Sequence, residues 1–96
     1  MAGYRLTRQA VADLTDIYLF TFETFGEAQA ERYVEAMYDC IAVLSENPRL
    51  GRDASNIRPG IFRFTHRNHS IFYKSESDGI LIVRVLHERM DPTHRM

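Results

Sequence analysis

The segment from Phe62 to Arg89 constrains the fold most, because its apolar residues form short β-branched and aromatic runs broken by turn residues. The runs Ile71–Tyr73 and Ile80–Val83 are too short for helices and predict strands. Arg67-Asn68 and Ser77-Asp78-Gly79 separate the strands. Asp-Gly is a strong hairpin signal, since glycine tolerates the positive φ of a tight turn. We therefore expect a meander of three antiparallel strands.

Two helical patterns precede this segment. The first begins near Arg8, after a possible Thr7 cap, and has apolar residues at three- and four-residue spacing: Ala10, Val11, Leu14, Ile17, Tyr18, Phe22 and Phe25. The second runs from about Glu27 to Ser45, and its stripe consists of Ala30, Tyr33, Val34, Met37, Ile41 and Leu44. Gly26 between them favours a left-handed helix end. The two helices should therefore form a tight antiparallel hairpin.

The expected fold class is α+β, with the order β-α-α-β-β-β. Tyr4-Arg5-Leu6 would form a short edge strand, and the helical hairpin would pack on one face of a small, mostly antiparallel sheet. Asn47-Pro48 ends the second helix. The linker from there to Pro59-Gly60 is longer than the usual ~4–6 residues, which makes it a candidate functional loop. Residues 1–96, with 45% apolar content, should form a single domain.

Charge and composition limit what the chain can bind. The net charge of −1 argues against a protein held on nucleic acid mainly by phosphate neutralisation. Residues 1–48 carry three basic and eight acidic residues, whereas residues 49–96 carry nine basic, five acidic and all four histidines. A single cysteine excludes an internal disulfide. An apolar leader segment or a run approaching ~20 apolar residues is not found. We therefore expect a cytoplasmic protein that does not enter a membrane.

Metal and cofactor chemistry are not expected. His66 and His69 are separated by two residues, which on a strand or turn does not place both rings on one metal without further ligands. The isolated glycines do not form a phosphate-binding loop. Cys40 lies on or beside the apolar stripe of the second helix and is interpreted as a small buried hydrophobe. We expect no metal and no cofactor.

Metal-independent RNA cleavage is the enzymatic alternative that remains. It needs a base and an acid with pKa values near neutrality, and cations that stabilise a charged phosphorane. The residues of these types are His66, His69 and His87, with Arg63, Arg67, Arg84 and Arg89. Each also has an ordinary structural explanation. Arg84 interrupts the apolar run Ile80 to Leu86, so it should be half-buried and need a partner such as Asp91, Glu88 or a helix acid.

A series of short segments matches a known family in order and spacing. In the first half these are Tyr4-Arg5-Leu6-Thr7, Ala10 with Asp13 and Leu14, Phe25-Gly26, Ala30-Glu31-Arg32-Tyr33, and Leu44 with Asn47-Pro48. In the second half they are Gly51-Arg52, Arg58-Pro59-Gly60, His69 with Ile71-Phe72-Tyr73, and Ile82 with Arg84-Val85-Leu86-His87, Arg89 and Asp91. Together they cover nearly the whole chain. The sequence resembles the ParE branch of the ParE/RelE toxin superfamily of bacterial toxin–antitoxin pairs.

The resemblance implies a cytoplasmic toxin in a hetero-oligomer with a cognate ParD-like antitoxin. ParE-type toxins poison DNA gyrase, which implies no catalytic site; target or antitoxin binding would then fall to Arg58, Arg63, Arg67, Arg84 and Arg89. RelE-type relatives instead cut mRNA in the ribosomal A site, and this alternative would use His87, Arg84 and Arg89. The chain departs from the RelE pattern, because no tyrosine follows Asp91 and Lys74 is the only lysine.

Apolar patterning also suits a protein partner. The helical stripes and the run Ile80–Leu86, apolar on both sides, offer more apolar surface than such a small fold can hide. We expect an amphipathic antitoxin helix on exposed parts of the hairpin and an extended segment at a free sheet edge. The basic second half would attract acidic antitoxin residues or, in the free toxin, face gyrase or DNA. A degenerate member that binds antitoxin but poisons nothing is a third possibility.

Overall fold

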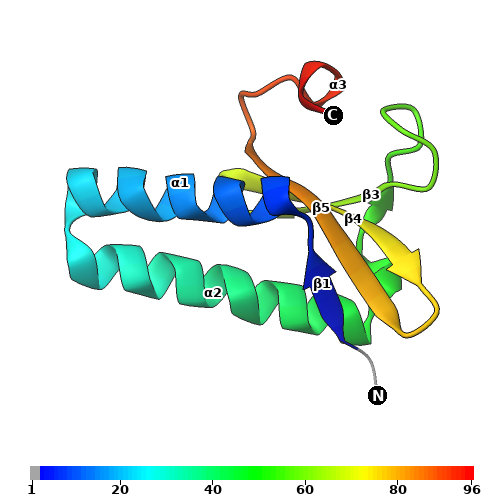
Figure 1. Ribbon diagram of the computed structural model, residues 1–96, viewed down its shortest axis with the longest axis horizontal. Coiled ribbons are helices and arrows are strands. Elements are labelled where there is room, and N and C mark those ends of the chain that lie inside the picture. Colours follow the sequence, from blue (N-terminus) through cyan, green and yellow to red (C-terminus); the bar gives the residue numbers. More distant parts are fainter. Residues whose placement is uncertain (1–2) are drawn as a thin grey trace.

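The computed structural model describes residues 3–96, which form a helical hairpin and a five-stranded sheet, followed by a short C-terminal helix (Figure 1). The elements, in chain order, are β1 (Tyr4–Leu6), α1 (Arg8–Phe25), α2 (Glu27–Glu46), the 3₁₀ helix η1 (Pro48–Leu50), β2 (Arg52–Asp53), β3 (Phe62–His66), β4 (His69–Glu76), β5 (Gly79–His87) and α3 (Pro92–Arg95). The expected α+β class, with its helical hairpin and mostly antiparallel sheet, is confirmed.

The sheet has the strand order β1-β5-β4-β3-β2. Strands β3, β4 and β5 form the expected antiparallel meander, whereas β1 runs parallel to β5, with Tyr4 opposite Ile80 and Leu6 opposite Ile82. Gly79 begins β5 with a φ of 152°, a backbone conformation that favours glycine. A Cβ at Gly79 would also collide with the carbonyl of Gly3. This position therefore lets the start of the chain approach the last strand closely.

Three short elements were not predicted: η1, β2 and α3. Each has only two to four residues, which is too short to give a helical or strand period. Strand β2 exists through its pairing with β3, where Arg52 lies opposite Arg63. Helix α3 begins after Asp91, whose carboxylate accepts a hydrogen bond from the Thr93 N–H at 3.0 Å. Part of the long linker after α2, residues 52–53, is therefore held at the edge of the sheet by its pairing with β3.

The ends of the two long helices follow the expected signals. Thr7 Oγ1 accepts a hydrogen bond from the Ala10 N–H at 3.0 Å and donates to the Val83 carbonyl at 2.7 Å, so it joins the α1 start to β5. Gly26 separates the helices with a φ of 94°. Its N–H donates to the Phe22 carbonyl at 2.8 Å. Helix α2 ends at Glu46, one residue beyond the predicted end.

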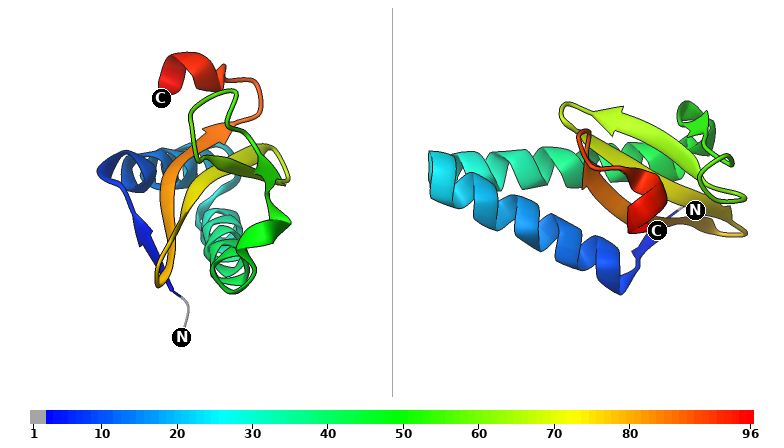
Figure 2. Two further views of the ribbon diagram at one scale, coloured as in Figure 1. Left: turned by 90° about the vertical axis from the view of Figure 1, so that its right-hand side faces the viewer. Right: turned by 90° about the horizontal axis from the view of Figure 1, so that it is seen from above.

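An apolar cluster lies on each face of the sheet. Figure 2 shows the helical hairpin lying along one of these faces. The helix-side cluster joins the hairpin to the sheet and consists of Ala10, Leu14, Ile17, Met37, Ile41, Leu44, Ile71, Tyr73, Ile80, Ile82 and Val85. The outer cluster consists of Ala54, Ile61, Phe72, Val83 and Leu86, with Ile57, Leu81 and Met96 packed against it. Tyr73 lies opposite Ile82 and Phe72 opposite Arg84, so Val83 forms a bulge. Strand β5 therefore serves both clusters.

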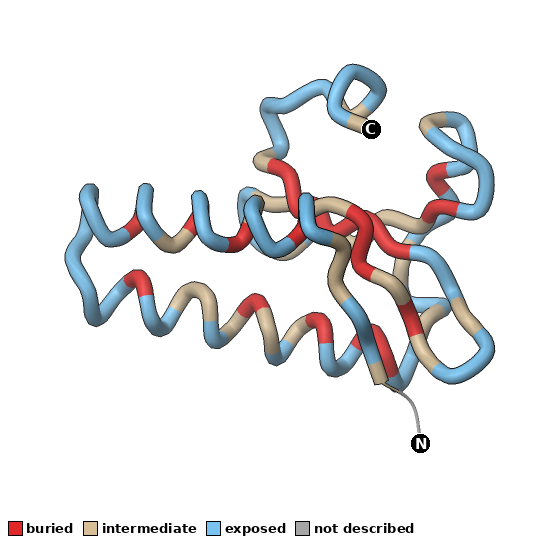
Figure 3. Tube along the Cα trace, viewed as in Figure 1, coloured by how far each residue is buried: buried red, intermediate tan, exposed pale blue. Residues whose placement is uncertain are grey.

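The predicted α1 stripe is only half buried (Figure 3). Ala10, Leu14 and Ile17 are in the core, but the side chains of Val11, Phe22 and Phe25 are 47%, 43% and 59% exposed. Apolar surface on the helical hairpin therefore remains exposed, as the sequence predicted. Helix α1 contacts α2 and β5 through the flank that carries Ala10, Leu14 and Ile17, and these two elements leave the other flank uncovered. Within residues 3–96, none of the helices has the length and apolar content needed to cross a bilayer.

Candidate functional site

Arg84 is held by an ion pair with Asp13 of α1. Its Nε and Nη2 donate to the two carboxylate oxygens at 2.8 and 2.9 Å, and the side chains are only 13% and 12% exposed. The backbone N–H of Val85 donates to the same carboxylate at 2.9 Å. The hydrogen bond to Asp13 raises the pKa of Arg84 above the ordinary value of an arginine. The partner is thus a helix acid, one of the three predicted possibilities, and not Asp91 or Glu88.

Arg84 also reaches the C-terminal segment. Its Nη1 donates to the carbonyl oxygen of Arg95 in α3, close to Met96 of the outer cluster. One side chain therefore connects α1, β5 and α3. Such a guanidinium, with its Nε and both terminal nitrogens donating to internal acceptors, is a structural connection between the layers.

The other predicted arginines lie in different surroundings. Arg63 on β3 donates through Nε to the Ser70 hydroxyl at 3.0 Å, and its guanidinium carbon lies 5.3 Å from the centroid of the Phe72 ring. Arg63 therefore belongs with the outer cluster. Arg58, Arg67 and Arg89 are exposed: the first in the loop before β3, the second in the β3–β4 turn, the third after β5.

A histidine cluster forms where α2 faces the adjoining ends of β3, β4 and β5; it consists of Tyr33, His66, His69 and His87. The Tyr33 hydroxyl lies 2.7 Å from His69 Nδ1. His69 and His87 are opposite each other in the sheet, and their ring centroids are 5.4 Å apart with perpendicular planes. His66 Nε2 is buried and has no hydrogen-bond partner within residues 3–96. The fold thus brings together three of the four histidines.

The surroundings of Tyr33, His66 and His69 favour the neutral forms of these three side chains. Burial first, and then the charges of His87 and His66, lower the pKa of His69 to about 4, against the opposite effect of Glu88. The pKa of His66 is lowered by burial and then by the charge of Arg67. Burial raises the pKa of Tyr33, so the phenol keeps its proton. At neutral pH a neutral His69 can accept a hydrogen bond from the Tyr33 hydroxyl, but it is a poor source of protons.

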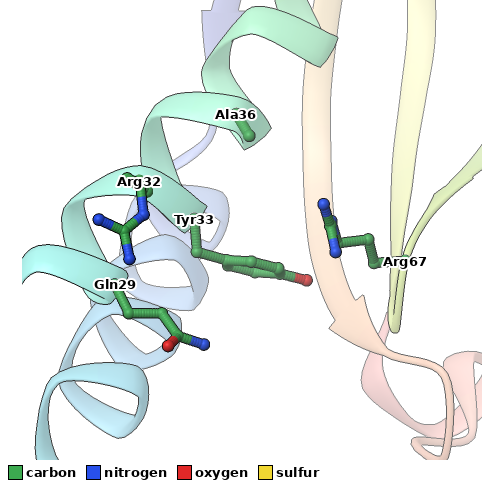
Figure 4. Close-up of a pocket in the computed structure, with 5 residues that line it drawn as sticks. All are labelled: Gln29, Arg32, Tyr33, Ala36 and Arg67. Carbon is green, nitrogen blue, oxygen red and sulfur yellow. The ribbon is translucent and has the colours of Figure 1, made fainter. Parts of the chain in front are cut away.

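An open hollow of about 260 Å³ lies beside the histidine cluster (Figure 4). It is lined by Gln29, Arg32, Tyr33 and Ala36 on α2 and by Arg67 on the β3–β4 turn. Figure 4 shows the Tyr33 hydroxyl directed from α2 toward Arg67. Sequence reasoning named Arg67 but missed Gln29 and Arg32, and it assigned Tyr33 to packing. Their spacing of three and four residues was a signal for one polar helix face.

The residues predicted for RNA cleavage are only partly associated. His87 lies against His69, and its Nδ1 accepts a hydrogen bond from the backbone N–H of Arg89 at 3.1 Å. Arg84 instead pairs with Asp13. Cys40 is half-buried beside the helix-side cluster, and burial raises the pKa of its thiol. Within the described range 3–96, no three His, Cys, Asp or Glu side chains are grouped as metal ligands.

Comparison with known proteins places the chain in a family. The family model described as "ParE toxin of type II toxin-antitoxin system, parDE" matches residues 4–92. The chain is 38% identical over 89 residues to toxin ParE1 of Mycobacterium tuberculosis, covering 92% of this chain and 91% of that protein. It is 33% identical over 97 residues to toxin ParE of Escherichia coli, covering 100% and 94% of the two chains.

The fold has a solved counterpart. A chain in the structure titled "Chromosomal ParDE TA system from P. aeruginosa" matches with a TM-score of 0.78 and 24% identity, covering 91% of this chain and 96% of that one. The class of protein is therefore the toxin of a type II toxin–antitoxin system. Within this class the chain belongs to the ParE family, and the resemblance predicted from the sequence is confirmed.

Proposed function

We propose that this toxin inhibits DNA gyrase, that it has no catalytic site of its own, and that a cognate ParD-like antitoxin neutralises it in a cytoplasmic hetero-oligomer. Membership of the ParE family over residues 4–92 supports the proposal. The structural observation that supports the proposed lack of a catalytic site is the Arg84–Asp13 pair. A cation that stabilises a phosphorane must direct its donors at the substrate. Arg84 directs them at Asp13 and at the carbonyl of Arg95.

The antitoxin-binding surface is proposed from the exposed flank of α1. Val11, Phe22 and Phe25 lie exposed along it, and the Tyr18 and Phe22 rings are 6.1 Å apart. This flank suits an amphipathic antitoxin helix, because its apolar residues recur along one side of α1. Strands β1 and β2 form the two edges of the sheet, where an extended antitoxin segment can add a strand.

Gyrase inhibition is tested with toxin that has been separated from its antitoxin. The toxin is mixed with gyrase, supercoiled plasmid and ATP, and DNA is examined after detergent and protease treatment. Linear plasmid should accumulate, and a toxin with His87→Ala should still produce it, because inhibition needs no acid or base. A folded, lethal toxin that yields no linear plasmid would contradict the proposal.

Ribosome-dependent mRNA cleavage is the second candidate function, and one observation favours it. The fold groups Tyr33, His69 and His87 beside the exposed Arg67, although His69 is neutral at physiological pH. Toxin, ribosomes and an mRNA are incubated, and the RNA ends are mapped. Cuts that disappear with His87→Ala, while the variant still folds and binds antitoxin, would establish this function in place of gyrase inhibition.

Antitoxin binding is tested with substitutions on two exposed surfaces. Phe22→Ser and Phe25→Ser should weaken binding, because they remove apolar contact area from the α1 flank. Leu50→Ser is the matched control, since Leu50 is also half-exposed but lies in the linker after α2. Affinities are measured by calorimetry with the cognate antitoxin. Loss of binding only with Leu50→Ser would show that the partner contacts the loop at 49–58 instead.

A further inference from the structure

The last two turns of α1 carry an exposed apolar patch that none of the roles above uses. The side chains of Leu19 and Phe20 are 50% and 66% exposed, and Phe20 is the most exposed large apolar residue within residues 3–96. The acids Asp16 and Glu23, also exposed, lie one helical turn before and after this pair. These four residues are called the tip patch. Scattered exposed apolar side chains are ordinary, but two large neighbours framed by charge form a surface that a partner can cover.

The tip patch lies on a different side of α1 from the proposed antitoxin-binding flank. Thr21 is buried, and Phe20 and Phe22 directly precede and follow it. Successive helical residues are rotated by about 100°, so the two phenylalanines project to opposite sides of the helix and Leu19 lies almost opposite Thr21. An antitoxin helix on Phe22 and Phe25 therefore leaves Phe20 accessible to a second partner.

This part of the hairpin projects from the body of the protein. Figures 1 and 2 show the ends of α1 and α2 around Gly26 extending beyond the edge of the sheet. A projecting end is convex, so a partner must offer a concave surface to it. Aromatic side chains such as Phe20 are enriched at the centres of protein–protein interfaces, where they fill such concave surfaces. The shape therefore suits insertion of the hairpin end into a socket on a larger protein.

The charge around the tip patch is negative. Between Arg8 and Arg32 the sequence has no lysine or arginine, whereas its acidic residues there are Asp13, Asp16, Glu23, Glu27 and Glu31. Of these, Asp13 is paired with Arg84, and the other acids are exposed. Like charges that face each other across an interface are unfavourable, so a partner of this tip presents basic side chains around its socket. The acidic antitoxin residues that the basic second half favours would be repelled here.

We propose that the tip patch is the surface through which the toxin docks on gyrase, with Phe20 and Leu19 in an apolar socket whose rim carries lysine or arginine side chains. This inference rests on the proposed function and adds the site of contact. An enzyme that holds DNA has basic surfaces that neutralise phosphates, so it can offer such a rim beside the DNA. Phe20 supplies the buried anchor, and Asp16 and Glu23 steer and orient the encounter.

The docking site is tested by measuring two affinities for each full-length toxin variant, one for DNA-bound gyrase and one for the cognate antitoxin, by surface plasmon resonance. Phe20→Ser should weaken gyrase binding about tenfold or more, because an apolar anchor is lost, and leave antitoxin affinity unchanged. Phe22→Ser is the matched control, the same chemical change on the antitoxin flank, and should show the reverse pattern. Asp16→Asn combined with Glu23→Gln should slow association with gyrase and reduce its salt dependence, with little change in the dissociation rate.

The outcomes separate this inference from the proposed function. Wild-type toxin that neither binds gyrase nor yields linear plasmid would overturn both. Wild-type toxin that yields linear plasmid, together with a Phe20→Ser variant that does so equally well, would overturn the docking site alone. So would an equal loss of both affinities with Phe20→Ser, or faster association after the two acids are removed. Circular dichroism melting confirms that each variant is folded, as expected for exposed positions.

Discussion

The two faces of the sheet differ in how they are covered, although the same strands supply both. On the helix side, Ile41 and its neighbours come from long helices that satisfy their own backbone hydrogen bonds. On the outer side, Ile61 and Ala54 belong to an irregular loop, tied by the Ala54 N–H to Ile61 carbonyl bond at 2.8 Å, and α3 has only four residues. The difference indicates that the helix side dominates stability and the outer side opens more easily.

The largest expected effect is a difference in stability between substitutions on the two faces, at two isoleucines that are both fully buried, Ile41 and Ile61. Ile41→Ala should reduce the free energy of unfolding by about 4 kcal/mol, because helices hold the cavity open. Ile61→Ala should cost about 2 kcal/mol, because a loop can collapse into the space. Urea denaturation measures both. Equal losses would show that the two covers are equally rigid.

The Asp13–Arg84 pair connects the two faces of the sheet, so its removal measures how far the stability of the fold depends on that connection. Asp13→Ala should cost about 3 kcal/mol, because it leaves the mostly buried Arg84 without its carboxylate. The double variant with Arg84→Met should recover part of that loss, since no unpaired charge remains. Asp16→Ala, an exposed acid on the same helix, is the control. Denaturation midpoints of all three are compared; no recovery in the double variant would contradict this account.

Tyr73 tests how much the helix side depends on its polar contacts. Its hydroxyl donates to the Pro48 carbonyl at 2.7 Å and accepts from the Gly51 N–H at 2.9 Å, which fixes η1 after α2. Tyr73→Phe should cost about 2 kcal/mol, because two partly buried backbone groups lose their partner. Tyr38→Phe serves as the control. Similar melting temperatures for the two variants would show that η1 contributes little.

The smallest effect concerns pH and the rim of the helix side. The folded-state pKa of His69 is about 4, below the ordinary value of 6.5, so the unfolded state takes up a proton more readily. Its contribution to stability is therefore present above pH 6.5 and lost as the pH falls toward about 4. Melting temperatures at about pH 7.5 and about pH 5 measure this loss. His69→Gln should lose less between these two values than wild type; an equal loss would assign the effect elsewhere.

Most of the fold could be predicted from local patterns. Thr7 and Gly26 delimit α1, and the turns at Arg67 and Gly79 delimit the meander, because each position imposes its own backbone chemistry. The parallel β1–β5 pairing could not be predicted this way, since its partners are far apart in the sequence. Periodicity likewise gave the apolar stripe of α1 but not which flank its neighbours cover.

The candidate site was less predictable than the fold. The sequence named Arg84 as a half-buried residue in need of an acid, but choosing Asp13 required the packing of α1 on β5. It named His69 and His87 without their contact, which follows from the strand register. Arg32 was missed because it is exposed in a helix, and its relation to Arg67 exists only once the turn lies against α2.

The β1–β5 pairing has a consequence for synthesis. Residues 4–6 leave the ribosome well before their partners, residues 80–82. Contacts between such distant segments form slowly, since a long loop must close before they are made. The nascent chain therefore cannot complete its sheet until residues 80–82 have left the ribosome, and until then its apolar strands stay exposed to chaperones and proteases.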